Sequence, residues 1–252
     1  MSSAHASSNH AAARNGGSAL ISKIDEMDWD TVANRLDHQG YATITTLLTA
    51  GECEHVSKLY RQESRFRKRV VMAEKQYGQG EYQYFAYPLP AIAQTLRAAL
   101  YPRLVPIANR WQMAWGQRPT FPDQLDDFLA LCHSAGQAQP TPLLLKYQAG
   151  DFNCLHQDLY GDRVFPLQVA ILLSEPTVDF TGGEFVLTEQ PPERQARVRV
   201  VNLRQGDAVI FAVNQRPVQR DRGVQSVAMH HGVSPLHAGQ RYCLGIIFHD
   251  AA

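Results

Sequence analysis

The chain has 252 residues, of which 44% are hydrophobic and 19% are charged, and its 24 basic side chains balance 24 acidic ones. This composition is typical of a globular protein with a large core and excludes a low-complexity chain. A formal net charge of zero provides no overall field that would attract nucleic acid or an anionic membrane, so a polyanion would have to bind a local patch.

The N-terminal segment and the cysteines bear on the compartment. Residues 1–22 are rich in Ser, Ala, Asn and Gly and lack the basic-then-apolar pattern of a secretory signal, which predicts a disordered tail. No run of eighteen apolar residues predicts a membrane-spanning helix. The four cysteines, Cys53, Cys132, Cys154 and Cys243, form no CxxC pair and are expected to be free thiols. These features favour a cytoplasmic protein.

The first half of the chain, residues 23–140, is expected to be mostly helical. Trp29, Val32 and Leu36 recur at helical spacing, and Gly40 follows as a stop signal. This half is therefore predicted to form a helical support for whatever fold follows it.

Three further segments of this half carry distinct patterns. Residues 41–48 alternate like a strand, and Thr49 is a suitable N-cap for the helix that follows. Residues 90–116 follow a long helical pattern, which Pro102 and Pro106 should kink or divide.

An aromatic segment, "YGQGEYQYF", covers residues 77–85. Its Tyr82 and Tyr84 would lie on one face of a strand, because side chains alternate along a strand. The segment is a candidate substrate lid. A hairpin packed on the rest of the fold accounts for the pattern equally well.

From residue 141 the pattern changes to short apolar runs separated by turns that contain Gly, Pro or Asn. Seven such runs cover residues 142–148, 165–174, 182–189, 196–203, 206–213, 225–233 and 241–249. No helical pattern separates them, which predicts an antiparallel sandwich or barrel. We expect a mainly β fold with N-terminal helices and a double-stranded β-helix (jelly-roll) core over 141–252, within a single domain over 23–252.

A histidine and an aspartate stand two residues apart in "CLHQD", at His156 and Asp158. Such a pair is weak evidence for a metal site on its own. His231, near the end of a later strand, completes the two-histidine, one-carboxylate set that binds non-haem Fe(II) and leaves coordination positions open. His230 and His231 point to opposite faces of that strand, and the spacing to Arg241 favours His231.

Two residues suit a carboxylate ligand. Arg241 follows His231 by ten residues, and a short turn between them would return the chain beside its neighbour, so that the guanidinium points into the barrel. Tyr147 precedes His156 by nine residues on the preceding strand, where its hydroxyl could donate to the same carboxylate. Together they predict a binding site for a dicarboxylate.

This set of residues resembles the 2-oxoglutarate/Fe(II)-dependent oxygenase superfamily. "FTGGEFVL" and "GDAVIF" are similar to the framework of its prolyl-hydroxylase-like members, and "LKYQAGDFNCLHQD" with "HGVSPLHAGQRYCL" is similar to its DNA-alkylation-repair branch. Residues 66–90 and the ending "GIIFHDA" resemble a bacterial family of predicted nucleic-acid oxygenases. The chain departs from the repair branch at Leu145, at Cys243 and at "FHD", where that branch has two asparagines and a second arginine.

The resemblance implies an enzyme that uses Fe(II), 2-oxoglutarate and O₂ to hydroxylate a substrate C–H bond, with succinate and CO₂ as co-products. It implies that His156, Asp158 and His231 hold the iron and that Arg241 and Tyr147 bind the cosubstrate. An alkylated nucleobase would then undergo oxidative demethylation.

Other functions fit the same residues. The substrate could equally be an amino acid, a peptide or a small metabolite. A cupin-like metalloenzyme that does not use 2-oxoglutarate is a further alternative, although it would not need Arg241 as a dicarboxylate clamp. A non-catalytic binding module is disfavoured because all three ligand residues are present.

Two local basic clusters bear on whether nucleic acid is a partner. The first spans residues 61–69, and the second, residues 214–223, contains Arg216, Arg220 and Arg222. Basic residues beside aromatic ones can bind single-stranded nucleic acid through phosphate contacts and stacking. A solvated charged face is the alternative interpretation.

Overall fold

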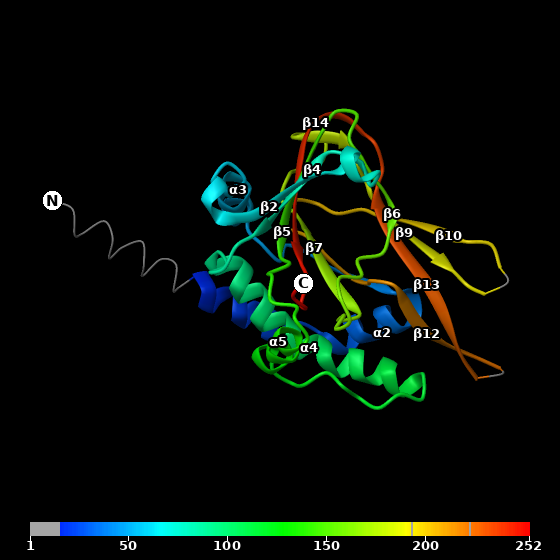
Figure 1. Ribbon diagram of the computed structural model, residues 1–252. Helices are drawn as coiled ribbons and strands as arrows, with labels where there is room; N and C mark the ends of the chain where they lie inside the picture. Colours follow the sequence, from blue (N-terminus) through cyan, green and yellow to red (C-terminus); the bar gives the residue numbers. More distant parts are fainter. Residues whose placement is uncertain (1–15, 193, 222) are drawn as a thin grey trace.

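The computed structural model describes residues 16–192, 194–221 and 223–252, and it contains two antiparallel sheets with helices on one side (Figure 1). The α-helices are α2 (Trp29–Gln39), α3 (Ala50–Leu59), α4 (Ala91–Ala114) and α5 (Leu125–Ser134), and residues 16–25 are also helical. Two short 3₁₀ helices are η1 (Glu63–Arg65) and η2 (Met72–Lys75). The strands are β1 (Tyr41–Ile44), β2 (Phe66–Val71), β3 (Gly78–Gln79), β4 (Glu81–Phe85), β5 (Leu143–Gln148), β6 (Phe152–His156), β7 (Leu167–Leu172), β8 (Phe180–Gly182), β9 (Phe185–Gln190), β10 (Arg197–Val201), β11 (Ala208–Ala212), β12 (Gln215–Arg220), β13 (Gly223–Val233) and β14 (Leu236–Ile246).

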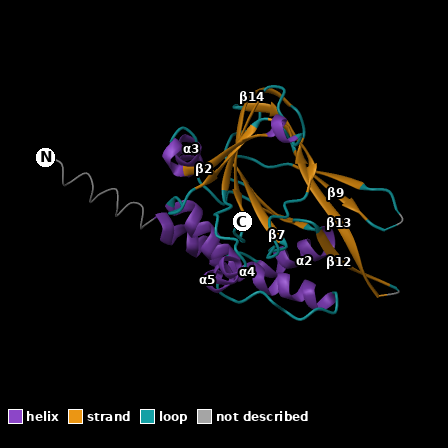
Figure 2. Cartoon of the chain, in the orientation of Figure 1, coloured by secondary structure: helices purple, strands orange, loops and turns teal. Residues whose placement is uncertain are grey.

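The larger sheet has eight strands in the order β1-β11-β7-β14-β5-β4-β2, with β8 paired to β14. The smaller sheet has six strands in the order β10-β9-β13-β6-β3, with β12 paired to β13. The chain therefore crosses repeatedly between the two sheets, as expected for the predicted jelly-roll core. Figure 2 shows α2, α4 and α5 gathered along one side of this core.

The central strands β7 and β11 of the larger sheet are buried on both faces, which explains why they are almost entirely apolar. In β11, Ala208, Ile210 and Ala212 pack in the cluster that contains the helices, whereas Val209 and Phe211 pack in the cluster shared with the smaller sheet. This alternation follows from the two-residue period of a strand. The helices thus cover one face, and the space between the sheets lies on the other.

Local signals place several elements where we predicted them. The Thr49 side chain accepts from the backbone N–H of Glu52, whose carboxylate accepts from the Thr49 N–H, so a capping box starts α3. Gly40 ends α2 in the left-handed conformation, at φ 77°.

Three predictions for the first half of the chain need correction. Pro102 and Pro106 do not divide α4, because burial of one face of this long helix offsets the missing hydrogen bonds. Residues 16–22 of the predicted tail are helical, and Leu20 is buried, while residues 1–15 lie outside the described residues. The half is also less helical than expected, because β2, β3 and β4 join the sheets.

No helix among the described residues is both long enough and apolar enough to cross a membrane.

A buried ion pair fastens the end of the chain to α4. Arg97 Nη2 lies 2.7 Å from Asp250 Oδ1, and the guanidinium also donates to the carbonyl oxygens of Ile247 and Phe248 at 2.9 and 2.8 Å. The side chains of Arg97 and Asp250 are 1% and 0% exposed. This pair holds in place the segment that follows β14.

We expect Arg97→Met to lower the free energy of unfolding by about 3–5 kcal/mol, because it leaves the Asp250 carboxylate buried without its cation. The matched control is Arg103→Met, which removes an exposed pair with Asp25 and should cost at most about 1 kcal/mol. Urea denaturation of both variants measures the difference. Equal losses of stability would show that the buried pair contributes no more than the exposed one.

Candidate active site

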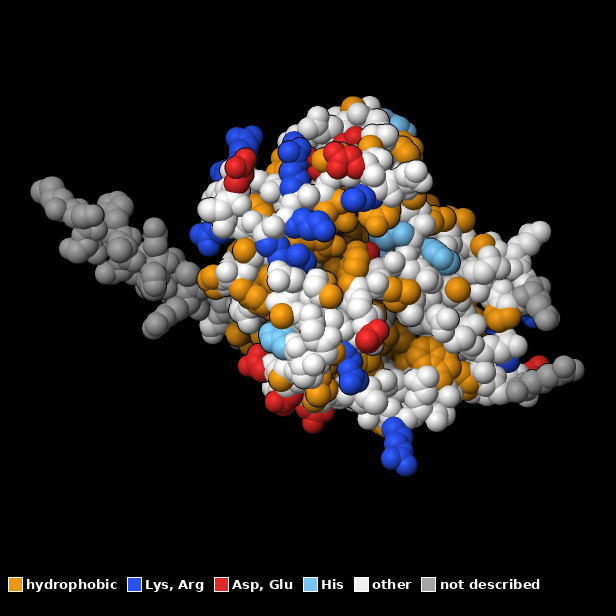
Figure 3. Space-filling view, in the orientation of Figure 1, with side chains coloured by type: hydrophobic (Ala, Val, Ile, Leu, Met, Phe, Trp, Pro, Cys, Tyr) orange, Lys and Arg blue, Asp and Glu red, His pale blue; other side chains and the backbone are white. Residues whose placement is uncertain are grey.

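A cavity of about 530 Å³ opens between the two sheets. Its lining residues come from β2, β4, β5, β7, β11 and β14 of the larger sheet, from β6, β9 and β13 of the smaller one, and from the loops between them. In the space-filling view it is a hollow with hydrophobic walls, with Lys and Arg side chains along one side and histidine close by (Figure 3). All five residues predicted for the site, His156, Asp158, His231, Arg241 and Tyr147, line this cavity.

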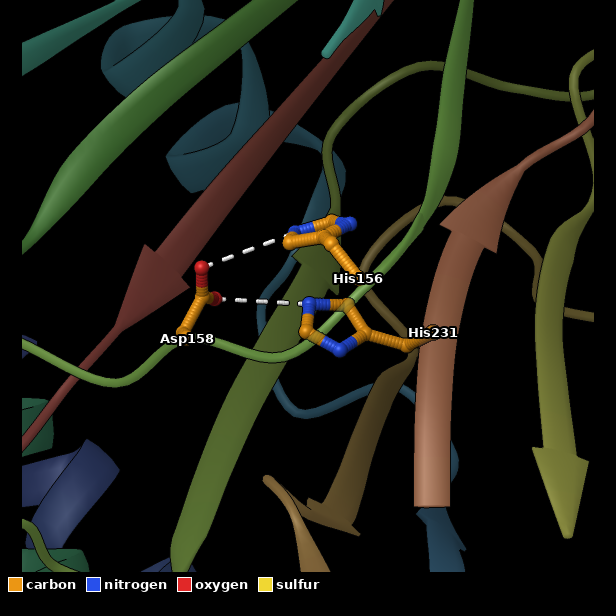
Figure 4. A group of neighbouring side chains, drawn as sticks. All are labelled: His156, Asp158 and His231. Atoms are coloured by element: carbon orange, nitrogen blue, oxygen red, sulfur yellow. Dashed lines mark ion pairs between the residues drawn. The ribbon is translucent and has the colours of Figure 1, made fainter. Parts of the chain in front are cut away.

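The three predicted metal-binding residues meet at its wall (Figure 4). His156 ends β6 and stands directly opposite His231 in β13, because these strands pair in antiparallel register. Asp158 follows in the loop after β6. One ligand atom from each residue lies within 4.8 Å of the others. The His156 Nε2–Asp158 Oδ1 and His231 Nε2–Asp158 Oδ2 distances are 3.5 and 3.3 Å.

Hydrogen bonding leaves one ring nitrogen of His156 free for a metal. Its Nδ1 lies 2.8 Å from the carbonyl oxygen of Cys154, which can only accept, so Nδ1 carries the proton. Burial lowers the pKa of His156, and its electrostatic interaction with His231 lowers it further. The imidazole is therefore neutral at neutral pH, with the Nε2 lone pair directed toward Asp158 and His231.

The Asp158 carboxylate remains charged although it is buried. Burial alone would raise its pKa, but the hydrogen bond and electrostatic interaction with His231, together with the Tyr160 hydrogen bond, lower it below the ordinary value. Gln168 Nε2 donates to the second carboxylate oxygen at 3.0 Å. Two imidazoles and one carboxylate that converge in this way are a donor set suited to Fe(II).

The neighbouring histidine does not take part. His230 is half-buried and lies on the other face of β13, as alternation along the strand requires, whereas His231 is 6% exposed and faces the cavity.

Arg241 and Tyr147 lie opposite each other on β14 and β5. Arg241 is 2% exposed, and its Cζ lies 5.5 Å from the centroid of the Tyr147 ring. Arg241 Nε and Tyr147 Oη are buried without a hydrogen-bond partner among the described residues. Burying such groups costs free energy unless a ligand pairs with them, so the two residues indicate an anion-binding end of the cavity. Burial raises the pKa of Tyr147, which keeps its hydroxyl a donor.

The aromatic segment contributes β3 to the smaller sheet and β4 to the larger one, and it also lines the cavity. β4 pairs with β5 and with β2, as in the hairpin interpretation, and Tyr82 and Tyr84 face the cavity edge to face, with ring centroids 5.3 Å apart. The guanidinium of Arg67 lies over the Tyr84 ring, with Cζ 4.7 Å from the ring centroid. The segment therefore forms a fixed aromatic wall.

The second basic cluster is smaller than its sequence suggested. Arg216 is 3% exposed and pairs with Glu189 at 2.9 Å, so it supports the core rather than a surface patch. Arg222 lies outside the described residues. From the first cluster, Arg67 and Lys68 line the cavity.

Sequence reasoning missed two residues that contact Asp158. Tyr160 Oη donates to Asp158 Oδ1 at 2.7 Å, and Gln168 binds the other oxygen. For Gln168 there was a local signal, because it is the one polar residue in the buried strand β7. For Tyr160 the signal was its position two residues after the aspartate.

Comparisons with known proteins agree with this geometry. The chain matches the model of the Oxygenase-NA family, described as an oxygenase catalysing oxidative methylation of damaged DNA, over residues 80–251. It is 47% identical over 191 residues to an uncharacterized protein found in two strains of Mycobacterium tuberculosis. The matched region covers 74% of this chain and 82% of that protein.

Two solved structures share the fold. The Pseudomonas putida prolyl-4-hydroxylase is 15% identical, with a TM-score of 0.51 over 89% of this chain and 99% of that one. A Burkholderia pseudomallei oxidoreductase of the 2OG-Fe(II) oxygenase family is 16% identical, with a TM-score of 0.51 over 90% and 94%. The predicted jelly-roll core is thereby confirmed. Because the family model matches more than half of the chain, the chain belongs to the Oxygenase-NA family and is a 2-oxoglutarate- and Fe(II)-dependent oxygenase.

Proposed function

We propose that His156, Asp158 and His231 hold Fe(II), that Arg241 and Tyr147 bind the distal carboxylate of 2-oxoglutarate, and that the enzyme oxidatively demethylates an alkylated nucleobase. The observation that carries the cofactor assignment is that two sets of residues, one suited to a metal and one to a carboxylate, line the same cavity. Three metal-ligand atoms lie within 4.8 Å of one another, and Nε of the buried Arg241 and Oη of Tyr147 lack partners among the described residues in the same cavity.

Bound iron and 2-oxoglutarate would supply the oxidising power, with O₂ as oxidant and succinate and CO₂ as co-products. The chain contributes the geometry. Cys154 holds His156 in the metal-binding tautomer, and burial keeps it neutral. Arg241 would bind a carboxylate through paired charge-assisted hydrogen bonds, which fixes the orientation of the cosubstrate.

The cavity walls would exclude water from the reacting centre. Phe185 and Phe211 lie against His231, with ring centroids 6.1 and 4.6 Å from the imidazole. These buried apolar side chains would shield the imidazole of His231 from solvent. Hydroxylation of an N-methyl group gives an N-hydroxymethyl group, which breaks down to formaldehyde and the free base.

The substrate proposal rests on the residues around the cavity and on the family description. Tyr77, Tyr82 and Tyr84 offer aromatic faces for a base, while Lys68 and Lys75 offer charge for phosphate. A flat ring against tyrosines and an anionic backbone against lysines is the arrangement that a nucleotide requires. The family's described action on damaged DNA supports the same substrate class.

The test compares substrate classes under one assay. The enzyme with Fe(II) and 2-oxoglutarate is given single-stranded oligonucleotides with or without N-methylated bases, and in parallel free amino acids and peptides. We expect methylated oligonucleotides alone to stimulate succinate formation, with one formaldehyde per succinate. Stimulation by peptides or amino acids without formaldehyde would instead assign the alternative, a hydroxylase of those substrates.

A charge variant connects the activity to the proposed surface. Lys68→Glu/Lys75→Glu should weaken oligonucleotide binding and lower the slope of log affinity against log salt by about 0.7 for each phosphate that a lysine no longer neutralises. Arg204→Glu, at an exposed position outside the cavity lining, is the matched control and should leave the slope unchanged.

A further inference from the structure

Asp158 is held differently from the two histidines. His156 and His231 stand on β6 and β13, where strand pairing fixes their backbone positions. Asp158 lies in the loop that follows β6, without strand pairing. A carboxylate on a loop has rotational freedom that a metal site cannot tolerate, so side-chain contacts must fix its orientation.

Two donors supply those contacts, one for each carboxylate oxygen. Tyr160 Oη donates to Oδ1 at 2.7 Å, and Gln168 Nε2 donates to Oδ2 at 3.0 Å. Hydrogen bonds to a charged acceptor are stronger than those between neutral groups. The two bonds approach opposite ends of the carboxylate, so together they determine its rotation.

Both donors are themselves fixed by their surroundings. Gln168 lies in the middle of the larger sheet, where β7 pairs with β11 and Gln168 stands opposite Phe211, and it is 5% exposed. The Tyr160 ring packs edge-on against Tyr84, with centroids 6.4 Å apart and planes at 90°. Because Gln168 is fixed by the sheet and Tyr160 by its packing on Tyr84, their hydrogen bonds fix the orientation of the Asp158 carboxylate relative to the sheet.

We propose that Tyr160 and Gln168 are positioning residues that orient the Asp158 carboxylate for metal binding. This inference rests on the proposed role of Asp158 as an iron ligand. The two residues act through Asp158 and need not contact the metal. The contribution of each is expected to be measurable without substrate and without turnover.

The experiment measures binding of Co(II) alone to the 2-oxoglutarate-free protein, by calorimetry and by the visible absorption of the bound ion. Tyr160→Phe removes only the hydroxyl, and Gln168→Met keeps the length of the side chain but removes the amide donor. Each should weaken Co(II) binding by roughly 10–100-fold, as expected when a metal ligand is deprived of its hydrogen-bond partner. Each should also change the Co(II) spectrum, which a purely structural role would not alter.

Tyr242→Phe is the matched control, because it removes a hydroxyl that donates to Gln240 Oε1 at 3.0 Å, from a tyrosine outside the cavity lining. It should bind Co(II) with wild-type affinity and spectrum. Wild-type binding and spectra in both Tyr160→Phe and Gln168→Met would overturn the inference. The two substitutions lie on different elements, so if one variant fails to fold the other still tests it.

His231→Ala separates this inference from the proposed function. If His231→Ala loses Co(II) binding while the two positioning variants keep it, only the positioning roles are rejected. If His231→Ala binds Co(II) as the wild type does, the metal site itself is rejected.

Discussion

Replacing His231 with alanine is expected to abolish tight Fe(II) binding and, with it, hydroxylation. The substitution removes one of three converging ligands, and the effect should exceed the roughly 10–100-fold typical of removing a hydrogen-bond partner of a ligand. The measurement is anaerobic titration with Fe(II) and 2-oxoglutarate, followed through the visible charge-transfer band of the ternary complex. The band should be present in the wild type and absent in His231→Ala.

His230→Ala is the control for this prediction. The two histidines are adjacent, but His230 lies on the other face of β13, so its replacement should leave the band unchanged. Disappearance of the band in His230→Ala but not in His231→Ala would reverse the ligand assignment. A wild-type protein that binds iron without developing the band would exclude 2-oxoglutarate and favour the cupin-like alternative.

Replacing Arg241 with methionine is expected to raise the dissociation constant for 2-oxoglutarate by about 100-fold or more. Hydrogen bonds to charged groups contribute about 1.5–3 kcal/mol each, and a guanidinium forms two with one carboxylate. Arg241→Lys should have an intermediate effect, because an ammonium lacks the planar pair of donors. Iron affinity should change little in either variant, which separates the cosubstrate end of the cavity from the metal end.

The same substitution should stabilise the protein without cofactor. Arg241 is buried, and its Nε lacks a partner among the described residues, so methionine removes a desolvation cost. Urea unfolding should give a higher free energy for Arg241→Met, whereas Arg204→Met, at an exposed position, should match the wild type. A destabilised Arg241→Met with unchanged 2-oxoglutarate affinity would show that the arginine serves the fold rather than the cosubstrate.

The sequence by itself determined the class of fold and the positions of seven of its strands. Period-two alternation and turn residues depend on neighbours in the chain, so the seven apolar runs after residue 141 were readable as strands without a structure, whereas β6 and β12 lie outside those runs. Spacing along a strand also determined that His231 and His230 face opposite sides, and the ten-residue interval between His231 and Arg241 implied a turn between two strands. The prediction that these residues serve metal and cosubstrate came from residue chemistry and spacing together with the resemblance to the oxygenase superfamily, and the titrations above test it.

Only the tertiary structure decided which residues meet across the sheets. The sequence around Gln168 shows a polar residue in an apolar strand but does not indicate that its amide contacts Asp158. The sequence around Arg216 also does not indicate that this side chain is buried in an ion pair with Glu189. Likewise, the sequence of α4 contains two helix breakers that burial against the larger sheet overrides. The physical reason is the same in each case. Spacing along the chain determines the face on which a side chain lies, whereas its partner and its burial depend on the free energy of packing the two sheets and the helices together.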